Sequence, residues 1–177
     1  MGKYIYEDGL ETKRLITRKL VYDDYKTWAG FFEEPEAIQF FPFLEPTSSE
    51  AIAKTWIERQ LVRYDEERYG LQALIEKKTG AIIGQCGLLL QEVEDVFELE
   101  VGYALHKKYW GKGYATEAAI RFKEYGFAND QADSIISIID VHNIPSQKVA
   151  RKNGMTPGKP IIWHDMNVYI FRIHKPS

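Results

Sequence analysis

A glycine-rich segment between two apolar stretches has the residue types that can bind an anion. It runs from Tyr109 to Thr116 and reads YWGKGYAT. Glycine lets backbone N–H groups turn inward with no Cβ in the way, and a helix expected to start near Tyr114 adds partial positive charge. The segment therefore predicts a turn that holds a pyrophosphate, and a turn that needs glycine for geometry alone is the alternative. It is neither a P-loop nor a dinucleotide fingerprint, because it lacks Gly-Lys-Ser/Thr and a third glycine.

Two polar side chains about 30 residues further on, Asn143 and Ser146, form the second chemical signal. They lie between a β-branched stretch and a short helical pattern. Asn143 is a suitable N-cap and Pro145 suits the first helical turn, so one interpretation is capping alone. An amide and a hydroxyl three residues apart could also face a ligand that lies across the strand ends. The residues by themselves leave both interpretations open.

Strands and helices must position these residues. Alternation of apolar and polar residues predicts a strand over Val96–Leu105, with Phe97 and Leu99 on one face and Glu98 and Glu100 on the other. The other strands are expected over 11–20, 71–76, 81–91 and 134–141, with one or two closing strands over 161–173. The helices are expected over 22–32, 35–41, 48–67 and 145–153, with one more from Tyr114. This order predicts the α/β class, a mixed sheet in a single domain over residues 1–177.

Composition bounds the classes of function. The chain has 177 residues, of which 45% are hydrophobic and 28% charged, and a formal charge of −3. This mixture excludes wholesale disorder, and the charge gives no bulk attraction for nucleic acid. Cys86 is the single cysteine and is interpreted as a buried structural thiol in a reducing compartment. The segment from Met1 to Gly9 does not have the pattern of a signal peptide, and no stretch reaches the length of a membrane span, so we expect a cytoplasmic chain.

The four histidines do not predict a metal site. His106 and His142 lie near the two signals, but no pair of histidines has ligand spacing with a cysteine or carboxylate cluster. We therefore expect no metal in the site.

In combination and in this order, the two signals resemble the GNAT superfamily of acyl-CoA N-acyltransferases, and most closely its branch of ribosomal-protein N-terminal acetyltransferases. The family's pyrophosphate signature, Arg/Gln-x-x-Gly-x-Gly/Ala, falls on Trp110–Ala115, and the string Tyr109–Ala118 is typical of this branch. So are Asn143 and Ser146 followed by ARKNGM, and the opening LETKRL of residues 10–15. The resemblance covers nearly the whole chain. It implies the acyl-CoA N-acyltransferase fold, a mostly antiparallel twisted sheet flanked by helices.

The resemblance implies acetyl-CoA as cosubstrate and gives roles to individual residues. Ser146 would be a catalytic residue near the thioester sulfur. Two positions depart from the family pattern. Trp110 replaces the usual Arg or Gln, so backbone amides must contact the phosphates, and Ala150 replaces a tyrosine acid, so Ser146 or a water must protonate the thiolate. The implied cofactor-binding residues are Tyr103, Ala104 and Leu105 on the strand, Gly111, Lys112, Gly113, Tyr114, Ala115 and Thr116 in the turn, and Asn143, which would hydrogen-bond the pantetheine.

The implied reaction is direct attack of a neutral amine on the thioester carbonyl. An α-amine has a pKa of about 8, so a base that removes its proton is useful at neutral pH. Glu100 is the preferred base because its strand should run beside the carbonyl, and a solvated strand-face carboxylate is the alternative interpretation. Glu98 is a weaker candidate.

The sequence says less about the residues that would bind the amine acceptor. His164 could line the acceptor pocket or serve a loop. We expect an acetyl-CoA-dependent N-acetyltransferase for a small amine or a protein N-terminus, acting as a monomer or homodimer with no membrane or direct nucleic-acid contact. The alternatives are another acyl-CoA, a polyamine or antibiotic acceptor, and a non-catalytic CoA-binding sensor. An aromatic group expected mostly in the core, and in part as the acceptor wall, comprises Phe31, Phe32, Phe40, Phe41 and Phe43.

Overall fold

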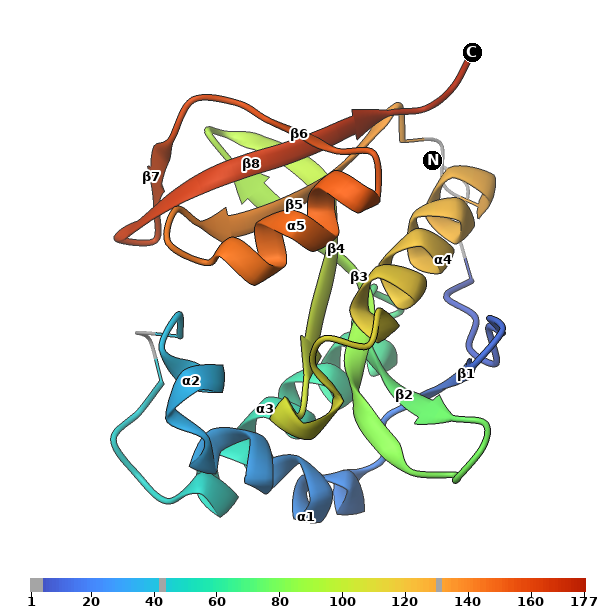
Figure 1. Ribbon diagram of the computed structural model, residues 1–177, viewed down its shortest axis with the longest axis vertical. Helices are drawn as coiled ribbons and strands as arrows, with labels where there is room; N and C mark the ends of the chain where they lie inside the picture. Colours follow the sequence, from blue (N-terminus) through green and yellow to red (C-terminus); the bar gives the residue numbers. More distant parts are fainter. Residues whose placement is uncertain (1–4, 42–43, 130–131) are drawn as a thin grey trace.

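The computed structural model describes residues 5–41, 44–129 and 132–177, so Phe43 lies outside the described residues. Eight strands form one sheet in the order β1-β2-β3-β4-β5-β8-β6, with β7 paired to β8 (Figure 1). The β4–β5 pair is parallel, and every other pairing between the described strands is antiparallel. The predicted α/β class with a mixed, mostly antiparallel sheet is confirmed.

The first part of the chain builds four strands and the helices that pack on one of their faces. The strands are β1 (Leu15–Lys19), β2 (Leu71–Glu76), β3 (Ile82–Val93) and β4 (Val96–Leu105). The helices are η1 (Tyr22–Asp24), α1 (Tyr25–Trp28), η2 (Ala29–Glu33), α2 (Pro35–Ile38) and α3 (Ser49–Asp65). The Ser48 hydroxyl caps α3 by accepting the Ala51 N–H at 3.1 Å. The strand predicted over 11–20 is shorter in the structure, and the helix predicted over 48–67 has nearly its expected length.

The second part of the chain closes the sheet. Its helices are η3 (Lys107–Tyr109), α4 (Tyr114–Asn129) and α5 (Ile144–Lys152). Its strands are β5 (Ser134–Asp140), β6 (Thr156–Pro157), β7 (Ile161–Trp163) and β8 (Met166–His174). The closing segment forms the two paired strands β7 and β8, and the short β6 was not predicted. Within the described ranges, each helix is too short or too polar to cross a membrane.

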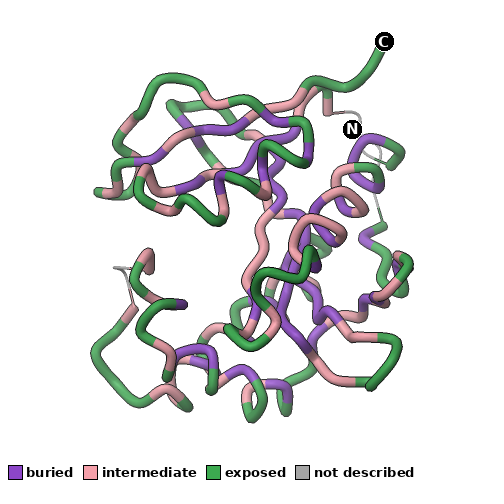
Figure 2. Tube along the Cα trace, viewed as in Figure 1, coloured by how far each residue is buried: buried purple, intermediate pink, exposed green. Residues whose placement is uncertain are grey.

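Helices cover both faces of the sheet, and each face has its own core. Adjacent residues Ala73 and Leu74 of β2 belong to different clusters because alternate side chains of a strand point to opposite faces. Phe122 of α4 packs in one cluster and Ile57 of α3 in the other. Cys86 is fully buried, and burial raises the pKa of its thiol, as expected of a structural cysteine. Figure 2 shows the buried residues along the strands and the helix faces that touch them.

The parallel strands β4 and β5 stay together for only a short distance. Leu99 pairs with Ile135 and Glu100 with Ile136, and the ladder ends there although β4 continues to Leu105. Figure 1 shows β5 and β8 turning away from the lower part of β4. The fold therefore separates two neighbouring strands directly beyond Glu100.

Candidate active site

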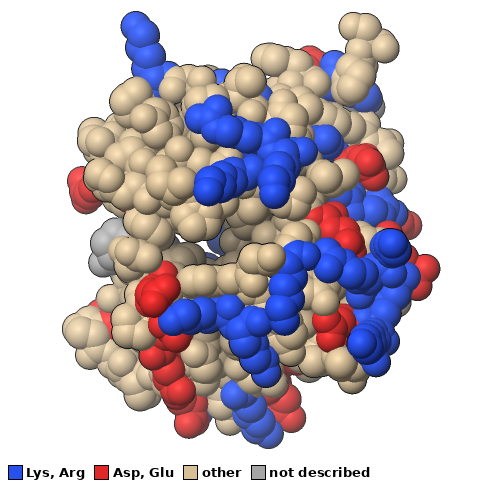
Figure 3. Space-filling model, viewed as in Figure 1, with Lys and Arg blue, Asp and Glu red and all other residues tan. Residues whose placement is uncertain are grey.

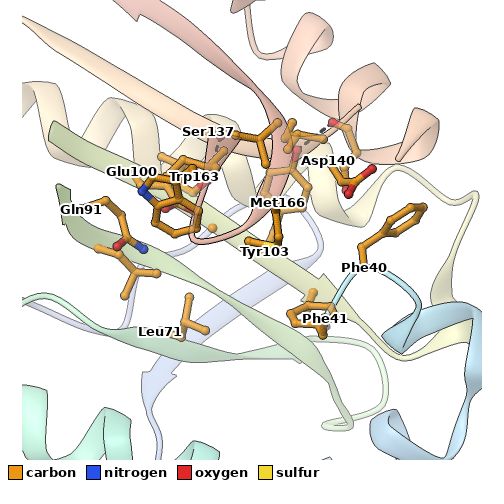
Figure 4. Close-up of a pocket in the computed structure, with 18 of the residues that line it drawn as sticks. Phe40, Phe41, Leu71, Gln91, Glu100, Tyr103, Ser137, Asp140, Trp163 and Met166 are labelled. Carbon is orange, nitrogen blue, oxygen red and sulfur yellow. Dashed lines mark hydrogen bonds between the residues drawn. The ribbon is translucent and has the colours of Figure 1, made fainter. Parts of the chain in front are cut away.

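A cavity of about 410 Å³ lies where β4 and β5 separate. Its lining comes from β3, β4 and β5, from α3 and the start of α5, and from the hairpin of β7 and β8. Figure 3 shows the hollow between the two halves of the molecule. In Figure 4, Glu100 and Gln91 lie toward one end of the cavity, Phe40 and Phe41 toward the other, and Tyr103 between them. Small-molecule sites commonly have this size.

The Glu100 carboxyl lies in the wall of this cavity and is largely shielded from water. Glu100 is 9% exposed, and its Oε2 has no hydrogen-bond partner among the described residues. Burial raises the pKa of Glu100 to about 7, because the charged form loses hydration, while the nearby Gln91 amide and the Arg63 charge oppose this only in part. The alternative interpretation of Glu100 as a solvated carboxylate is therefore wrong.

Glu98, two residues earlier on β4, has a structural partner. Its two carboxylate oxygens accept hydrogen bonds from Nε and Nη2 of Arg172 at 3.0 and 2.6 Å. Both oxygens of the Glu98 carboxylate are therefore occupied by Arg172, whereas Oε2 of Glu100 has no partner among the described residues.

The backbone of β4 beyond Glu100 has an outer edge that faces the gap. The Ser137 hydroxyl donates to the Val101 carbonyl at 2.8 Å, so the first carbonyl beyond the paired section is satisfied. The Ala104 carbonyl points the other way, toward β3, where a Cβ on Gly84 would approach it to 2.3 Å. Since backbone groups alternate sides along a strand, Tyr103 and Leu105 direct theirs to the gap. The backbone role expected for Ala104 is therefore corrected, and Ala104 contributes only to the lining.

Tyr103 and Ser146 connect β4 to α5 across the gap. The Tyr103 hydroxyl donates to the Ser146 carbonyl oxygen at 2.8 Å, and both residues line the cavity. Burial raises the pKa of Tyr103 well above its ordinary value of 10.0, so its hydroxyl keeps its proton at neutral pH. The Tyr103 hydroxyl is therefore neutral and is engaged with the Ser146 carbonyl across the gap.

Asn143 is the N-cap of α5, where its Oδ1 accepts the Ser146 N–H at 3.2 Å. It also lines the cavity. Its Nδ2 hydrogens make no hydrogen bond to the described part of the chain. The capping role of Asn143 is therefore confirmed. A contact between its amide nitrogen and a bound ligand stays a prediction.

The glycine-rich turn between β4 and α4 has the backbone that the sequence predicts. Gly111 and Gly113 have φ of 74° and 82°, in the left-handed region that favours glycine. The first intrahelical bond runs from the Glu117 N–H to the Gly113 carbonyl at 3.0 Å. The N–H groups of Tyr114 to Thr116 come before it and have no intrahelical acceptor, as at any helix start.

Arg14 holds the glycine-rich turn in place. Its Nη1 donates to the Lys112 carbonyl at 2.9 Å, its Nε pairs with Glu117 at 2.9 Å, and its guanidinium lies 4.1 Å from the centre of the Tyr114 ring. Tyr114 is buried, and its hydroxyl donates to the Glu76 carboxylate. Tyr114 can therefore offer a ligand only its backbone, and Arg14 is a positioning residue that the sequence did not reveal.

Trp110 has a structural role in the same turn. Its indole N–H donates to the Leu105 carbonyl at 2.9 Å. The side chain that replaces the family's Arg or Gln therefore closes the end of β4, and anion binding by the backbone amides of the turn stays a prediction. Basic side chains gather on both sides of the hollow in Figure 3. The exposed ones in the β4–α4 segment and α5 are Lys107, Lys108, Lys112, Lys148, Arg151 and Lys152.

The aromatic residues divide between the core and the cavity. Phe31 and Phe32 are buried and pack on Trp28, whereas Phe40 and Phe41 line the cavity. The core position is confirmed for Phe31 and Phe32, and a role of Phe40 and Phe41 as an acceptor wall stays a prediction.

The structure settles the positions of two histidines. His164 has a φ of 46° and lies in the turn between β7 and β8, and it also lines the cavity. It is therefore both a turn residue and a pocket residue. His106 packs its ring 5.2 Å from that of Trp28. In the described ranges, no group of three or more His, Cys, Asp or Glu side chains is arranged to hold a metal ion.

Two arginines of α3, Arg59 and Arg63, also line the cavity, and the sequence analysis missed them. The available signal was their spacing of four on a predicted helix, which places them on one face. That spacing alone does not tell a binding face from a solvated one.

Comparison with known proteins gives the family. Residues 14–156 match the family model described as an acetyltransferase (GNAT) domain. Since the match spans most of the chain, the protein belongs to the GNAT acetyltransferase family, and it is an acetyltransferase. The predicted superfamily and enzyme class are confirmed.

Bacterial relatives cover most of the chain. It is 33% identical over 155 residues to the uncharacterized protein YkkB of Bacillus subtilis (strain 168), covering 86% of this chain and 87% of that one. It is 29% identical over 149 residues to the uncharacterized N-acetyltransferase p20 of Bacillus licheniformis, covering 80% and 79%.

Solved structures share the fold. An acetyltransferase from Agrobacterium tumefaciens str. C58 superposes with a TM-score of 0.79 at 23% identity, covering 99% of both chains. RimL, a ribosomal L7/L12 α-N-protein acetyltransferase solved with coenzyme A, superposes with a TM-score of 0.76 at 13% identity, covering 95% of this chain and 98% of that one. The acyl-CoA N-acyltransferase fold is confirmed.

Proposed function

We propose that this protein transfers the acetyl group of acetyl-CoA to a primary amine in the cavity between β4 and β5, within one GNAT-like domain over residues 1–177. The observation that carries the proposal is the Glu100 carboxyl, buried where the two strands separate and with its pKa raised to about 7. A base with that pKa is about half ionised at neutral pH and basic enough to take a proton from an amine.

The residues around the gap suit acetyl-CoA. Amides of the turn from Gly111 to Thr116 and the exposed basic side chains beside it would bind the phosphates. The outward N–H and carbonyl of Tyr103 and the N–H of Leu105, whose carbonyl already accepts from Trp110, would pair with the pantetheine amides as if with an added strand. The Asn143 amide nitrogen would donate to the same arm. When bound, acetyl-CoA supplies the thioester carbonyl that the amine attacks.

Residues of this chain would move two protons in the reaction. Glu100 would accept the proton of the attacking amine, directly or through a water. Ser146 would donate its hydroxyl proton to the departing thiolate sulfur while it takes a proton back from solvent, so that no alkoxide is left. The Tyr103 hydroxyl donates to the Ser146 carbonyl and would hold Ser146 in position.

The acceptor class is either a small amine or the α-amine of a protein. The name of RimL, a structural neighbour, supports protein α-amines, and the cavity volume of about 410 Å³ suits a small molecule. A non-catalytic CoA-binding sensor is the competing function. It would need neither a buried carboxyl with a raised pKa nor hydroxyl groups across the gap, so the presence of these groups supports a catalyst.

Thiol release from acetyl-CoA, measured with a panel of primary amines, tests this function. We expect one mole of free CoA per mole of N-acetylated product identified by mass spectrometry. Binding of acetyl-CoA without transfer to any amine of the panel would favour the sensor.

A further inference from the structure

The acceptor end of the cavity carries two arginines that have no acidic partner. Arg59 and Arg63 are four residues apart on α3, so they share a helix face, and both line the cavity. Four other arginines pair with carboxylates: Arg14 with Glu117, Arg18 with Asp24, Arg68 with Glu66, and Arg172 with Glu98. Within the described ranges, neither Arg59 nor Arg63 forms such an ion pair.

One hydrogen bond holds the Arg63 guanidinium, and most of its N–H donors are unused. Its Nη1 donates to Gln60 Oε1 at 3.0 Å, and that oxygen is fixed because it also accepts the Leu71 N–H at 2.8 Å. A guanidinium has five N–H donors in a planar fork that matches a carboxylate or a phosphate. Arg63 is therefore preorganised for an anion that the described residues do not supply.

The negative charge near Arg63 does not balance the positive charges around it. Burial and the positive charges of Arg59 and Arg68 lower the pKa of Arg63, and Glu100 opposes this only in part. The other acidic side chain in the lining is Asp140, whose Oδ1 accepts the His142 N–H at 2.8 Å. An anion bound between Arg59 and Arg63 would relieve this imbalance.

We propose that the acceptor is a small primary amine that also carries an anionic group, a carboxylate or a phosphate, bound by Arg63 and Arg59 while the amine faces Glu100. This inference rests on the proposed amine acetylation. Phe40, Phe41 and Trp56 give the rest of the acceptor an apolar wall. A polyamine fits poorly, because its distal ammonium groups would meet the two guanidinium groups.

Matched amines test the anionic group. Each pair has the same skeleton: amino acids against their carboxamides, and amino-alcohol phosphates against the free amino alcohols. Two readouts are used: the shift in melting temperature with CoA present, which reports binding without turnover, and kcat/KM for acetyl transfer. We expect the anionic member of at least one series to be preferred by about 10-fold or more, the scale of a hydrogen-bonded charge pair. The series that shows the preference identifies the group as carboxylate or phosphate.

Variants assign the preference to the arginines. Arg63→Gln should remove most of it, and Arg59→Gln should weaken it, while the Kd of CoA stays within about threefold of the parent. Because the Arg63 charge also lowers the pKa of Glu100, the preference is measured in each variant as the ratio of the anionic to the neutral member of a pair. Arg68→Gln is the matched control, since Arg68 follows the same helix but pairs with Glu66. It should keep the preference.

Equal or better binding of the neutral members, or an anion preference that survives Arg63→Gln and Arg59→Gln together, would overturn the inference and leave the proposed function intact. Arginine-dependent binding of anionic amines with no transfer would support the acceptor site and overturn the proposed function instead.

Discussion

Glu100 combines a buried position with an unoccupied proton-accepting atom. Its Oε2 lacks a hydrogen-bond partner in the described part of the chain, and burial raises its pKa from the ordinary 4.5 to about 7. An ordinary glutamate would be ionised but a weaker base, because the basicity of a carboxylate falls with its pKa. Glu98, on the same strand face, shows the contrast, since Arg172 occupies both of its oxygens.

Ser146→Ala should lower kcat by roughly 10-fold or more while the Kd of CoA changes by less than about threefold. The reason is that the hydroxyl acts mainly on charge that develops at sulfur, so its loss is felt in the transition state. Steady-state kinetics and calorimetric CoA titration measure the two quantities. Tyr103→Phe is the companion variant, because it tests the neighbouring hydroxyl. If Ser146→Ala weakens CoA binding and leaves saturated turnover unchanged, Ser146 is a binding or capping residue only.

At the scale of elements, the β4–α4 turn combines a strand end, two left-handed glycines and a helix start. Arg14 ties this turn to the residues before β1, and Trp110 closes the strand end. The helix amides that result are fixed before any ligand arrives, which lowers the entropic cost of binding phosphate.

Gly113→Asp should abolish the rise in melting temperature that CoA causes. A Cβ at this position would lie 3.4 Å from Arg14 Nη2, so the new carboxylate would disturb the arginine that holds the turn and would add negative charge where the pyrophosphate should bind. Gly80→Asp is the matched control, because Gly80 has a similar φ of 75°, with open space around it, in the β2–β3 turn. The control carries the same backbone strain and charge and should keep the CoA shift. Undiminished CoA binding by folded Gly113→Asp would refute the phosphate position.

The elements could be predicted from the sequence to the extent that their signals are local. The alternation of apolar and polar residues predicted β4, and the glycine pattern predicted the turn, because both signals come from residues that are neighbours in the sequence. Burial of Glu100 could not be predicted, since it requires β4 and β5 to separate next to a helix from another part of the chain. The same holds for Arg59 and Arg63, whose role depends on what α3 faces, and for the direction of the Ala104 carbonyl, which depends on register.

At the scale of the whole molecule, the cavity exists because the sheet opens along a single strand pair. The two halves meet at Leu99–Glu100 and Ile135–Ile136 and then diverge, so acetyl-CoA and acceptor could reach the same point from opposite faces. Tyr103 and α5 lie on one side of β4, and Glu100 and α3 on the other.

Burial of Glu100 should make the protein less stable as pH rises. Because the folded-state pKa lies above the ordinary value, the stability that the protonated group provides is fully present below about pH 4.5 and is lost as pH rises through about 7. The cost above pH 7 reaches about 3 kcal/mol at most. Denaturant unfolding of the parent and Glu100→Gln from pH 5 to 8 measures it, and the variant should gain stability relative to the parent with rising pH. A difference that does not change with pH would show that the carboxyl titrates normally.

The pH–rate profile of Glu100→Gln, with saturating acetyl-CoA and one amine, tests whether Glu100 is the catalytic base. If Glu100 accepts the amine proton, the variant should lose roughly 10²-fold or more near neutral pH, and the loss should shrink as pH approaches the pKa of the amine. Glu98→Gln, on the same strand face, should follow the parent. A Glu100→Gln profile parallel to the parent's, with less than about threefold loss throughout, would contradict the claim and leave proximity as the protein's contribution.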